Sequence, residues 1–529
     1  MTTSEIADAL KLTARLMELH NQNPFKTKSI ANAAFRLGKT GEDLEGKSLA
    51  ELEQIEGIGK GIAAKINELQ TTGSLKELDE AVAATPVGVI ELMNIKGIGP
   101  KKVGLLWREL GIESVGELLY ACKENRLITL KGFGAKTQAD VIKKIEFHDL
   151  NKNKAHYASL ESIALELVDK LKTTYNTDLV ALVGEMRRKC EVIEQVQILI
   201  GTDEIVKEEL PPNFVFITCT PASFYKELFL NSGTSAHIQQ AGKLADNLSF
   251  DSEEAVYESL GLPFIEPELR EGLNEVALAK EGKLPNLITL QDLKGILHNH
   301  STYSDGIHSL EEMAVYCKEL GYEYLGMCDH SQSAFYANGL KPDRVLQQQQ
   351  EIDELNKQLA PFKIFKGIES DILNDGSLDF EEEVLKSFDF VVASVHSNLK
   401  MDEAKANARL IKAIENPYTT ILGHPTGRLL LSREGYPIDH KKIIDACAAN
   451  NVVIELNAHP YRLDIDWRWI PYCLEKGVMI SINPDAHQKE GYHDMYFGTC
   501  VARKGMLSAK QCFNALNLSE IEAHFKAKK

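Results

Sequence analysis

The chain has 529 residues, a net charge of −18 at neutral pH and 44% hydrophobic residues. This length exceeds what one hydrophobic core usually supports, so we expect several domains. The acidic charge argues against a protein that coats nucleic acid with its whole surface. The apolar stretches fall short of the roughly 18 residues that span a bilayer, and the N-terminal sequence lacks a signal peptide's basic start and apolar run. We therefore expect a cytoplasmic protein with no membrane partner.

Residues 1–150 combine helical apolar spacing with three similar segments, IEGIGKGIAAKI (55–66), IKGIGPKKVGLL (95–106) and LKGFGAKTQADVI (130–142). Each segment joins two glycines to a helical pattern, which indicates an internal repeat. The glycines permit a tight turn, and the backbone N–H groups at the next helix start can receive a phosphate oxygen. We expect a helical DNA-binding domain, although plain turns between helices are the alternative. The candidate contacts are Gly57, Gly59, Lys60, Lys65, Gly97, Gly99, Lys101, Lys102, Gly132 and Gly134.

Residues 151–250 predict a small α+β unit. The polar run at 151–156 indicates a boundary, a helix is expected from about 157 to 175, and the runs LVALVG and NFVFITCT predict strands. Residues 251–290 contain three prolines and predict a loop-rich linker.

From residue 291 to 529, strand-like runs alternate with helical patterns, which predicts a parallel sheet or barrel. Residues i and i+2 of a strand point to the same face, so His298 and His300 aim together, as do Asp485 and His487. Seven runs carry a His, Asp, Glu or Asn at the last or next-to-last position: LKGILHNH, YLGMCDH, KIFKGIES, DFVVASVH, TTILGH, VVIELN and VMISINPDAH. These endings predict a polynuclear metal site at the C-terminal rim of the strands.

The ligand types indicate the chemistry of this site. A mixture of imidazoles and carboxylates suits Zn²⁺, Mn²⁺ or Fe²⁺ better than Mg²⁺. Two or three clustered cations make water nucleophilic near neutral pH and neutralise phosphoryl oxygens, so we expect cleavage of P–O bonds. Arg428 follows His424 closely and is either a bidentate phosphate contact or part of a structural ion pair.

Several segments in order resemble the bacterial-type family X DNA polymerases: the three glycine repeats, GEMRRKCEVIEQVQILI, NSGTSAHI, LGLPFIEPELREG and LPNLITLQDLKGILHNHSTYSDG. The resemblance covers essentially the whole chain and implies a multidomain fold. Residues 1–150 would form an all-α domain with three helix-hairpin-helix motifs, and 151–250 a reduced α+β nucleotidyltransferase core of the polymerase beta type. Residues 251–290 would be a thumb remnant or linker. Residues 291–529 would form a polymerase-and-histidinol-phosphatase (PHP) domain, a distorted (β/α)7 barrel.

The PHP resemblance also implies a ligand set. His298, His300, Glu369 and Asp485 would hold one ion and carry the catalytic water; Glu369 would bridge to a second ion held by His396 and His424; Asp305, His330 and His487 would hold a third. In the N-terminal domain, Lys65 matches the family's Schiff-base lysine, with a surface or phosphate-contacting lysine as the alternative.

The polymerase positions depart from the family. Nucleotidyl transfer by two metal ions needs hard oxygen ligands, and in this family they are a D-x-D pair and a third carboxylate. The matching residues here are Gln195, Gln197 and Val215. Because a neutral amide cannot neutralise a cation and valine offers no ligand, we expect that polymerisation has been lost.

The expected function is a DNA-repair 3′–5′ exonuclease, a metal-dependent phosphodiesterase that acts as a monomer on gapped, nicked or 3′-ended DNA. One alternative is a phosphomonoesterase for a small metabolite such as histidinol phosphate, and another is a DNA-binding scaffold. Three hairpin motifs joined to a complete phosphoesterase site favour the exonuclease.

Overall fold

The computed structural model divides into two compact units, residues 1–122 with 127–145, and residues 123–126 with 146–529. It describes residues 1–40, 44, 46–55, 57–95, 97–128, 130, 132–149, 154–207, 209–211, 213–245 and 248–528. The predicted domain boundary at residues 150 and 151 lies outside this described part. Among the described residues, no helix has the length and apolar character needed to cross a membrane.

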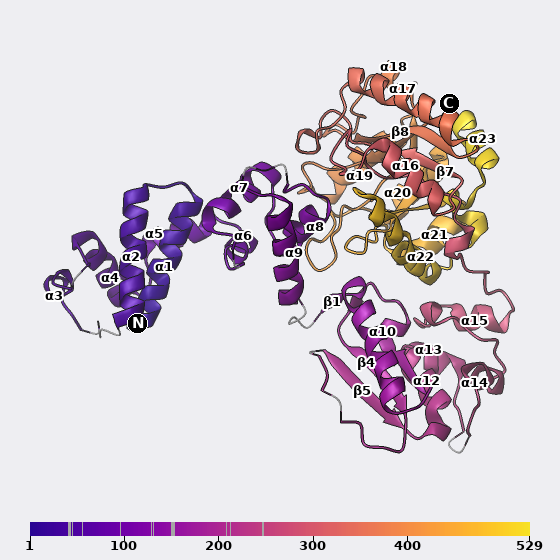
Figure 1. Ribbon diagram of the computed structural model, residues 1–529, viewed down its shortest axis with the longest axis horizontal. Coiled ribbons are helices and arrows are strands. Elements are labelled where there is room, and N and C mark those ends of the chain that lie inside the picture. The colour runs from indigo at the N-terminus through magenta and orange to yellow at the C-terminus, as the bar shows by residue number, and fades with distance from the viewer. Residues whose placement is uncertain are drawn as a thin grey trace. The chain divides into compact units, whose positions relative to one another are not determined.

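The first unit is helical over its described residues (Figure 1). Helices α1 and α2 pack side by side, and the core between α1, α2 and α4 contains Leu10, Ile30, Ile62 and Ile66. The helices are α1 (Thr3–Leu19), α2 (Pro24–Thr40), α3 (Leu49–Glu53), α4 (Lys60–Thr72), α5 (Lys76–Ala83), α6 (Val87–Leu92), α7 (Pro100–Leu110), α8 (Val115–Lys123) and α9 (Ala135–Asp149).

The three glycine repeats form turns of the same conformation. Gly57, Gly97 and Gly132 have φ values of +87°, +93° and +89°, a region that only glycine adopts readily. Gly59 and Gly99 are the N-caps of α4 and α7, with φ of −83° and −81°. The N–H groups of the first turn of each helix have no partner within the helix. The internal repeat of the sequence is therefore a repeat of backbone geometry.

The second unit begins with a small α+β core. Strand β2 pairs antiparallel with β4, and β4 pairs parallel with β5. Helix α10 packs on this sheet through Leu160, Ala164 and Leu171. The elements are β1 (Ala155–His156), α10 (Tyr157–Thr174), β2 (Val180–Val183), α11 (Gly184–Arg187), β3 (Val192–Ile193), β4 (Val196–Gly201), β5 (Phe214–Cys219), α12 (Phe224–Ser232) and α13 (Ser235–Ala241).

Residues 251–290 contain more ordered structure than a loop-rich linker. Helices α14 (Glu253–Ser259) and α15 (Glu275–Lys280) pack with α12 and α13 around a hydrophobic cluster that includes Phe229, Tyr257 and Val276. His237 of α13 lies at the centre, where Nδ1 is 2.7 Å from Glu275 and Nε2 is 2.9 Å from the Tyr257 hydroxyl. The prolines therefore interrupt a packed helical segment.

The C-terminal part is a nearly closed parallel barrel, as the sequence predicts. Its seven strands follow chain order from β6 to β12, and every neighbouring pair is parallel. The strands are β6 (Gly295–Ile296), β7 (Tyr324–Met327), β8 (Lys363–Asp371), β9 (Phe390–Ser394), β10 (Thr419–Leu422), β11 (Val453–Asn457) and β12 (Ile480–Asn483). The helices are α16 (Leu310–Glu319), α17 (Pro342–Leu359), α18 (Glu382–Leu385), α19 (Glu403–Ile414), α20 (His440–Asn450), α21 (Ile470–Glu475), α22 (Met495–Lys504) and α23 (Leu518–Lys528).

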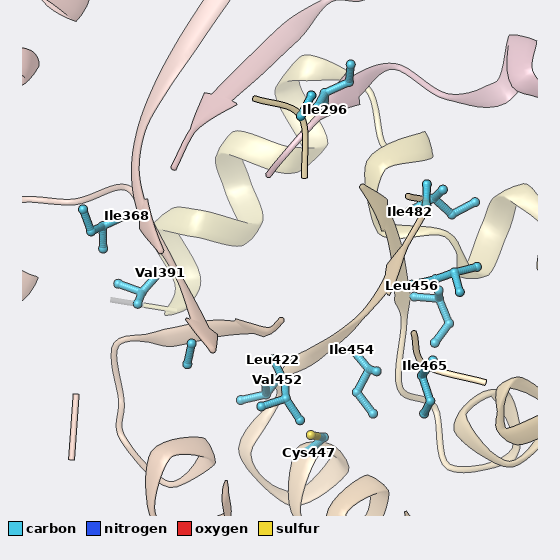
Figure 2. Packing of buried hydrophobic residues seen from close by; sticks show 14 of the residues in the cluster. Ile296, Ile368, Val391, Leu422, Cys447, Val452, Ile454, Leu456, Ile465 and Ile482 are labelled. Atoms are coloured by element: carbon cyan, nitrogen blue, oxygen red, sulfur yellow. The ribbon is translucent and has the colours of Figure 1, made fainter. Parts of the chain in front are cut away.

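Strand periodicity separates the two faces of this barrel. Ile368, Leu422 and Ile454 belong to the core shared with the surrounding helices, and Figure 2 shows Leu422, Val452 and Ile454 around Cys447 of α20. The alternate residues of the same strands face inward, and the second cluster that they form includes Phe390 and Ile421.

The C-terminal helix α23 completes the inward-facing cluster. Phe525 stacks on Phe390 with ring centroids 5.0 Å apart, and Ile521 is fully buried beside it. Within β8, Glu369 has the parity of Phe365 and therefore faces the interior further along the strand.

Candidate metal centre

The nine side chains predicted from the PHP resemblance converge at the C-terminal ends of the barrel strands. His298 and His300 follow β6, Asp305 lies in the next loop, and Glu369 is on β8. The others follow β7, β9, β10 and β12: His330, His396, His424, Asp485 and His487. The first and last strands meet at this rim, because the Asp485 N–H donates to His298 O at 3.1 Å and the His300 N–H donates to Ala486 O at 2.8 Å. Barrel closure therefore brings the pair His298 and His300 beside the pair Asp485 and His487, although His300 and Asp485 are 185 residues apart in the chain.

One group of potential ligands surrounds Asp485. Its Oδ1 lies 2.9 Å from Nε2 of His300 and 3.4 Å from Nε2 of His298. Nε2 of His298 is also 3.3 Å from Oε1 of Glu369. His298, His300 and Asp485 can present one ligand atom each within 4.8 Å of one another.

Glu369 lies between the groups. Its Oε1 is 3.0 Å from Nε2 of both His396 and His424, and its Oε2 is 2.8 Å from Nδ1 of His330. This position is the one that the sequence interpretation gives to a bridging carboxylate.

The third group contains Asp305, whose Oδ1 is 3.3 Å from Nε2 of His487 and 3.6 Å from Nε2 of His330. Together with His300 these residues offer four ligand atoms within 4.8 Å of one another. The rings of His300 and His487 are stacked, with their centroids 4.3 Å apart. The structure thus brings the nine residues together at one rim. The grouping differs in part from the one that the resemblance implies, because His300 also joins the third group and His330 also groups with Glu369 and His396.

The buried polar atoms of this cluster fit a set of divalent cations. Among the described residues, several nitrogens and oxygens are buried without a hydrogen-bond partner, including Nε2 of His298, Oε2 of Glu369 and both oxygens of Asp305. Unpaired buried polar groups are costly, and cations would satisfy them. His424 and Asp485 also have positive φ values of 22° and 52°, a strained conformation that is frequent at functional sites.

The protonation of the cluster is strongly perturbed. Burial lowers the pKa of His300 to about 3, with a further contribution from the charges of His487 and His330. Burial opposes protonation of His396 as well, but Glu369 and Asp371 together raise its pKa to about 10. Since a metal ligand must be unprotonated, metal binding would release the proton of His396, whereas His300 is already neutral.

Two carboxylates that the sequence interpretation did not select hold the ligand rings. His298 Nδ1 is 2.7 Å from Glu455 Oε1, and His396 Nδ1 is hydrogen-bonded to Asp371. Such partners fix the tautomer and raise the basicity of the ligating nitrogen. Glu455 stands inside the apolar run VVIELN, and a buried charge in such a strand is the signal that identifies it.

Two further side chains approach Asp485. Asn457 Nδ2 donates to its Oδ2 at 3.0 Å, and Arg462 is 3.2 Å from the same oxygen. Arg428 is placed differently. Its nitrogens donate to Asp466 at 2.6 Å, to the Arg462 carbonyl at 3.0 Å and to the Leu463 carbonyl. The structural ion pair, one of the two expectations for Arg428, describes this arrangement.

The polymerase positions lie together in the α+β core. Gln197 of β4 is the register partner of Val215 of β5, and Gln197 Nε2 donates to Gln195 Oε1 at 3.4 Å. The three residues that the resemblance aligns with the polymerase carboxylates are therefore neighbours in this sheet.

The basic residues beside these positions are engaged in ion pairs. Arg187 pairs with Glu253 at 2.5 Å, and Arg188 Nε is 3.2 Å from Glu271. These two arginines thus join the core to the segment 251–290.

In the first unit, the candidate lyase residue Lys65 pairs with Glu77.

Comparisons with known proteins agree with this architecture. Helix-hairpin-helix families match residues 1–75 and 89–146, and the PHP domain family matches residues 297–459. A probable phosphatase of Caldanaerobacter subterraneus is 35% identical over 141 residues, which cover 25% of this chain and 53% of that protein. A probable phosphatase of Acetivibrio thermocellus is 28% identical over 200 residues and covers 36% of this chain and 78% of its own length.

A match over the full length comes from Bacillus subtilis. The protein described as DNA polymerase/3′-5′ exonuclease PolX is 33% identical over 574 aligned positions, which cover 99% of this chain and all of that protein. The chain therefore belongs to the family X DNA polymerases of the bacterial type that carry a C-terminal PHP domain.

Proposed function

We propose that this protein is a metal-dependent phosphoesterase that removes nucleotides from the 3′ end of DNA, and that its polymerase core no longer polymerises. The observation that carries the proposal is the contrast between two sites of one chain. At the barrel rim, nine candidate ligand side chains converge, and several of their buried polar atoms have no hydrogen-bond partner among the described residues. In the core, the matching ligands are replaced by Gln195, Gln197 and Val215.

The reaction is hydrolysis of a phosphodiester. The water oxygen forms a bond to phosphorus, the P–O3′ bond breaks, and the penultimate 3′ oxygen takes up a proton while the terminal nucleotide leaves as a 5′-monophosphate. Two or three divalent cations (Zn²⁺, Mn²⁺ or Fe²⁺), when bound by the nine residues, supply the Lewis acidity that makes water nucleophilic and neutralises the phosphoryl oxygens. Glu455 and Asp371 orient the rings of His298 and His396 for this task.

DNA is the proposed substrate because hairpin motifs accompany the phosphoesterase site. The helix starts after Gly59 and Gly99 present backbone N–H groups, and Lys60, Lys101 and Lys102 stand beside them. Such contacts hold the phosphate backbone without reading the base sequence. The similarity of residues 1–75 and 89–146 to helix-hairpin-helix families supports this role.

The decisive experiment uses 5′-labelled duplex DNA with a gap or nick, in Mn²⁺. Wild-type protein should shorten the labelled strand one nucleotide at a time, and His300→Ala should abolish the shortening. His493→Ala is the matched control, because His493 is an exposed histidine of the same domain. Metal-loaded wild-type protein that leaves the DNA intact would refute the proposal.

A second candidate is hydrolysis of a small phosphomonoester, favoured by the similarity of the barrel to proteins described as probable phosphatases. The two are separated by kcat/KM for DNA and for histidinol phosphate, measured with the same metal-loaded preparation. A preference for the phosphomonoester, retained when Lys101 and Lys102 are both replaced by alanine, would favour this second function.

A further inference from the structure

A cavity of about 460 Å³ adjoins the metal centre, and one of its walls comes from the polymerase-like core. Asp485 and His487 of the candidate metal site line one part. Ala158, Ser159 and Ile163 of α10 line another part, together with Tyr461 and Phe497 of the barrel domain. Cavities that hold small ligands typically measure about 300–1,000 Å³, so this one has room for a nucleoside.

The core wall is fixed to the barrel by specific contacts. His156, directly before α10, lies 3.0 Å from the Leu430 carbonyl, and its ring is 4.3 Å from that of Tyr461. Lys189 donates to the Tyr496 hydroxyl at 2.8 Å. Arg468 of the barrel domain is 3.1 Å from Glu191 of the core. The position of α10 beside the metal centre is therefore determined by hydrogen bonds and ion pairs as well as by packing.

The lining of the cavity combines apolar and aromatic surface with the metal-ligand edge. Ile163 and the rings of Tyr461 and Phe497 offer surface on which a planar base can pack, and stacking of this kind tolerates every base. Asp485 and His487 lie where the phosphate of the same nucleotide would meet the cations. Lys123, Glu124, Glu490 and Asp494 also line the cavity. Burial raises the pKa of Asp494 to about 7, so the negative charge here comes mainly from Glu124 and Glu490. These two carboxylates outnumber the single ammonium group of Lys123, which disfavours a phosphate in this part and leaves it to a neutral base.

We propose that this cavity is the subsite for the base of the 3′-terminal nucleotide, and that α10 of the degenerate core forms one of its walls. The inference rests on the proposed exonuclease function and specifies how the substrate lies in that site. It also gives the polymerase-like core a role in the hydrolytic reaction of the barrel domain. A domain without its polymerase ligands still completes the hydrolytic site of the barrel.

The test compares two 5′-labelled DNAs that differ only in the 3′-terminal residue, which is thymidine in one and a tetrahydrofuran abasic analogue in the other. Wild-type protein with Mn²⁺ should remove thymidine with a kcat/KM at least about tenfold higher, as loss of base stacking predicts. Ala158→Trp fills the cavity and should bring this ratio to within about twofold of one. Leu165→Trp, on the exposed side of the same helix, should keep the wild-type ratio.

A second variant with a smaller side chain controls for misfolding of Ala158→Trp. Ile163→Ala removes contact surface without filling the cavity, and it should lower the ratio mainly through KM for the thymidine end. Because Ile163 also packs in part against the core of this domain, the variant should melt at a slightly lower temperature than wild type. A wild-type ratio near one, or equal losses on both DNAs in Ala158→Trp, would overturn the subsite while leaving the exonuclease proposal intact. Failure of wild-type protein to shorten either DNA would instead overturn the proposed function and this inference with it.

Discussion

Nδ1 of His298 and Oε1 of Glu455 lie 2.7 Å apart, and both side chains are fully buried. Glu455 also accepts a hydrogen bond from the His424 backbone N–H at 2.7 Å through its other oxygen. One carboxylate therefore positions two candidate ligands that follow different strands. This pairing leaves Nε2 of His298 directed toward Glu369 and Asp485, where a cation would lie.

The first prediction concerns this pair. Glu455→Gln preserves the shape of the side chain but removes its charge, so the imidazole becomes a weaker ligand. We expect metal affinity to fall by roughly 10–100-fold. The affinity is measured by competition with a chelator, and metal content is measured after dialysis. Glu354→Gln, on the exposed surface of α17, is the control. Unchanged metal affinity in Glu455→Gln would rule out the positioning role.

The second prediction concerns removal of the metal. Cations that bind only the folded protein stabilise it, by about 2.7 kcal/mol per site when the free metal is at 100 times its Kd. Chelation should therefore lower the melting temperature of wild-type protein, and Zn²⁺ or Mn²⁺ should restore it. The His300→Ala protein should respond less, because two groups of potential ligand atoms share His300. Equal responses of the two proteins would contradict this.

The metal ligands illustrate what the sequence predicts and what it does not. His298, His300, Asp485 and His487 follow from strand endings and a period of two, because every strand of a parallel barrel delivers its last residues to the same rim. The partner of His298 does not follow, since Glu455 lies 157 residues away and meets it only through the closed barrel.

The polymerase-like core and the segment 251–290 show the same difference between what can be predicted from the sequence and what depends on tertiary packing. The proposed loss of carboxylates at Gln195, Gln197 and Val215 comes from the sequence alone, because each position can be aligned to a motif. The ion pair of Arg187 with Glu253 is not readable, because it depends on how two segments pack. Prolines at 263, 267 and 285 suggested a linker, but burial of Tyr257 and Val276 makes the segment part of a packed core.

The third prediction concerns pH. Burial lowers the pKa of His156 to about 4, against 6.5 for an ordinary histidine. The unfolded chain therefore binds a proton between pH 6.5 and 4 that the folded chain does not, so stability falls as the pH drops through this range. The free energy of unfolding falls by about 3 kcal/mol over this pH range. His156→Gln removes the titration while keeping a donor for the Leu430 carbonyl.

This pH effect is measured as the difference in unfolding free energy between wild type and His156→Gln. Both proteins are treated with chelator, so that protonation of the metal ligands contributes equally to both. The difference should favour wild type more strongly at pH 7 than at pH 4. Parallel pH profiles would show that His156 does not titrate in this way.

The fourth prediction concerns the hairpins. Replacing both Lys101 and Lys102 by alanine should weaken DNA binding equally for unrelated sequences. The slope of log K against log salt should fall by about 0.9 for each phosphate contact that is lost. Lys76→Ala is the matched control, since Lys76 and Lys101 are 82% and 80% exposed and Lys76 lies outside the glycine repeats. An effect of the same size in the control would indicate a general charge effect.

The fifth prediction concerns the polymerase core. With amides at Gln195 and Gln197 and no ligand at Val215, the core has no carboxylate set for two catalytic cations. We expect no extension of a primer on gapped DNA with all four deoxynucleotides in Mg²⁺ or Mn²⁺. The assay should use the His300→Ala protein, because 3′ shortening by the barrel would otherwise hide a slow extension. Extension by this variant, abolished when Arg187 is replaced by alanine, would show that the core still polymerises. Absence of extension together with 3′ shortening by wild type would establish that one chain has lost one nucleic-acid chemistry and kept another.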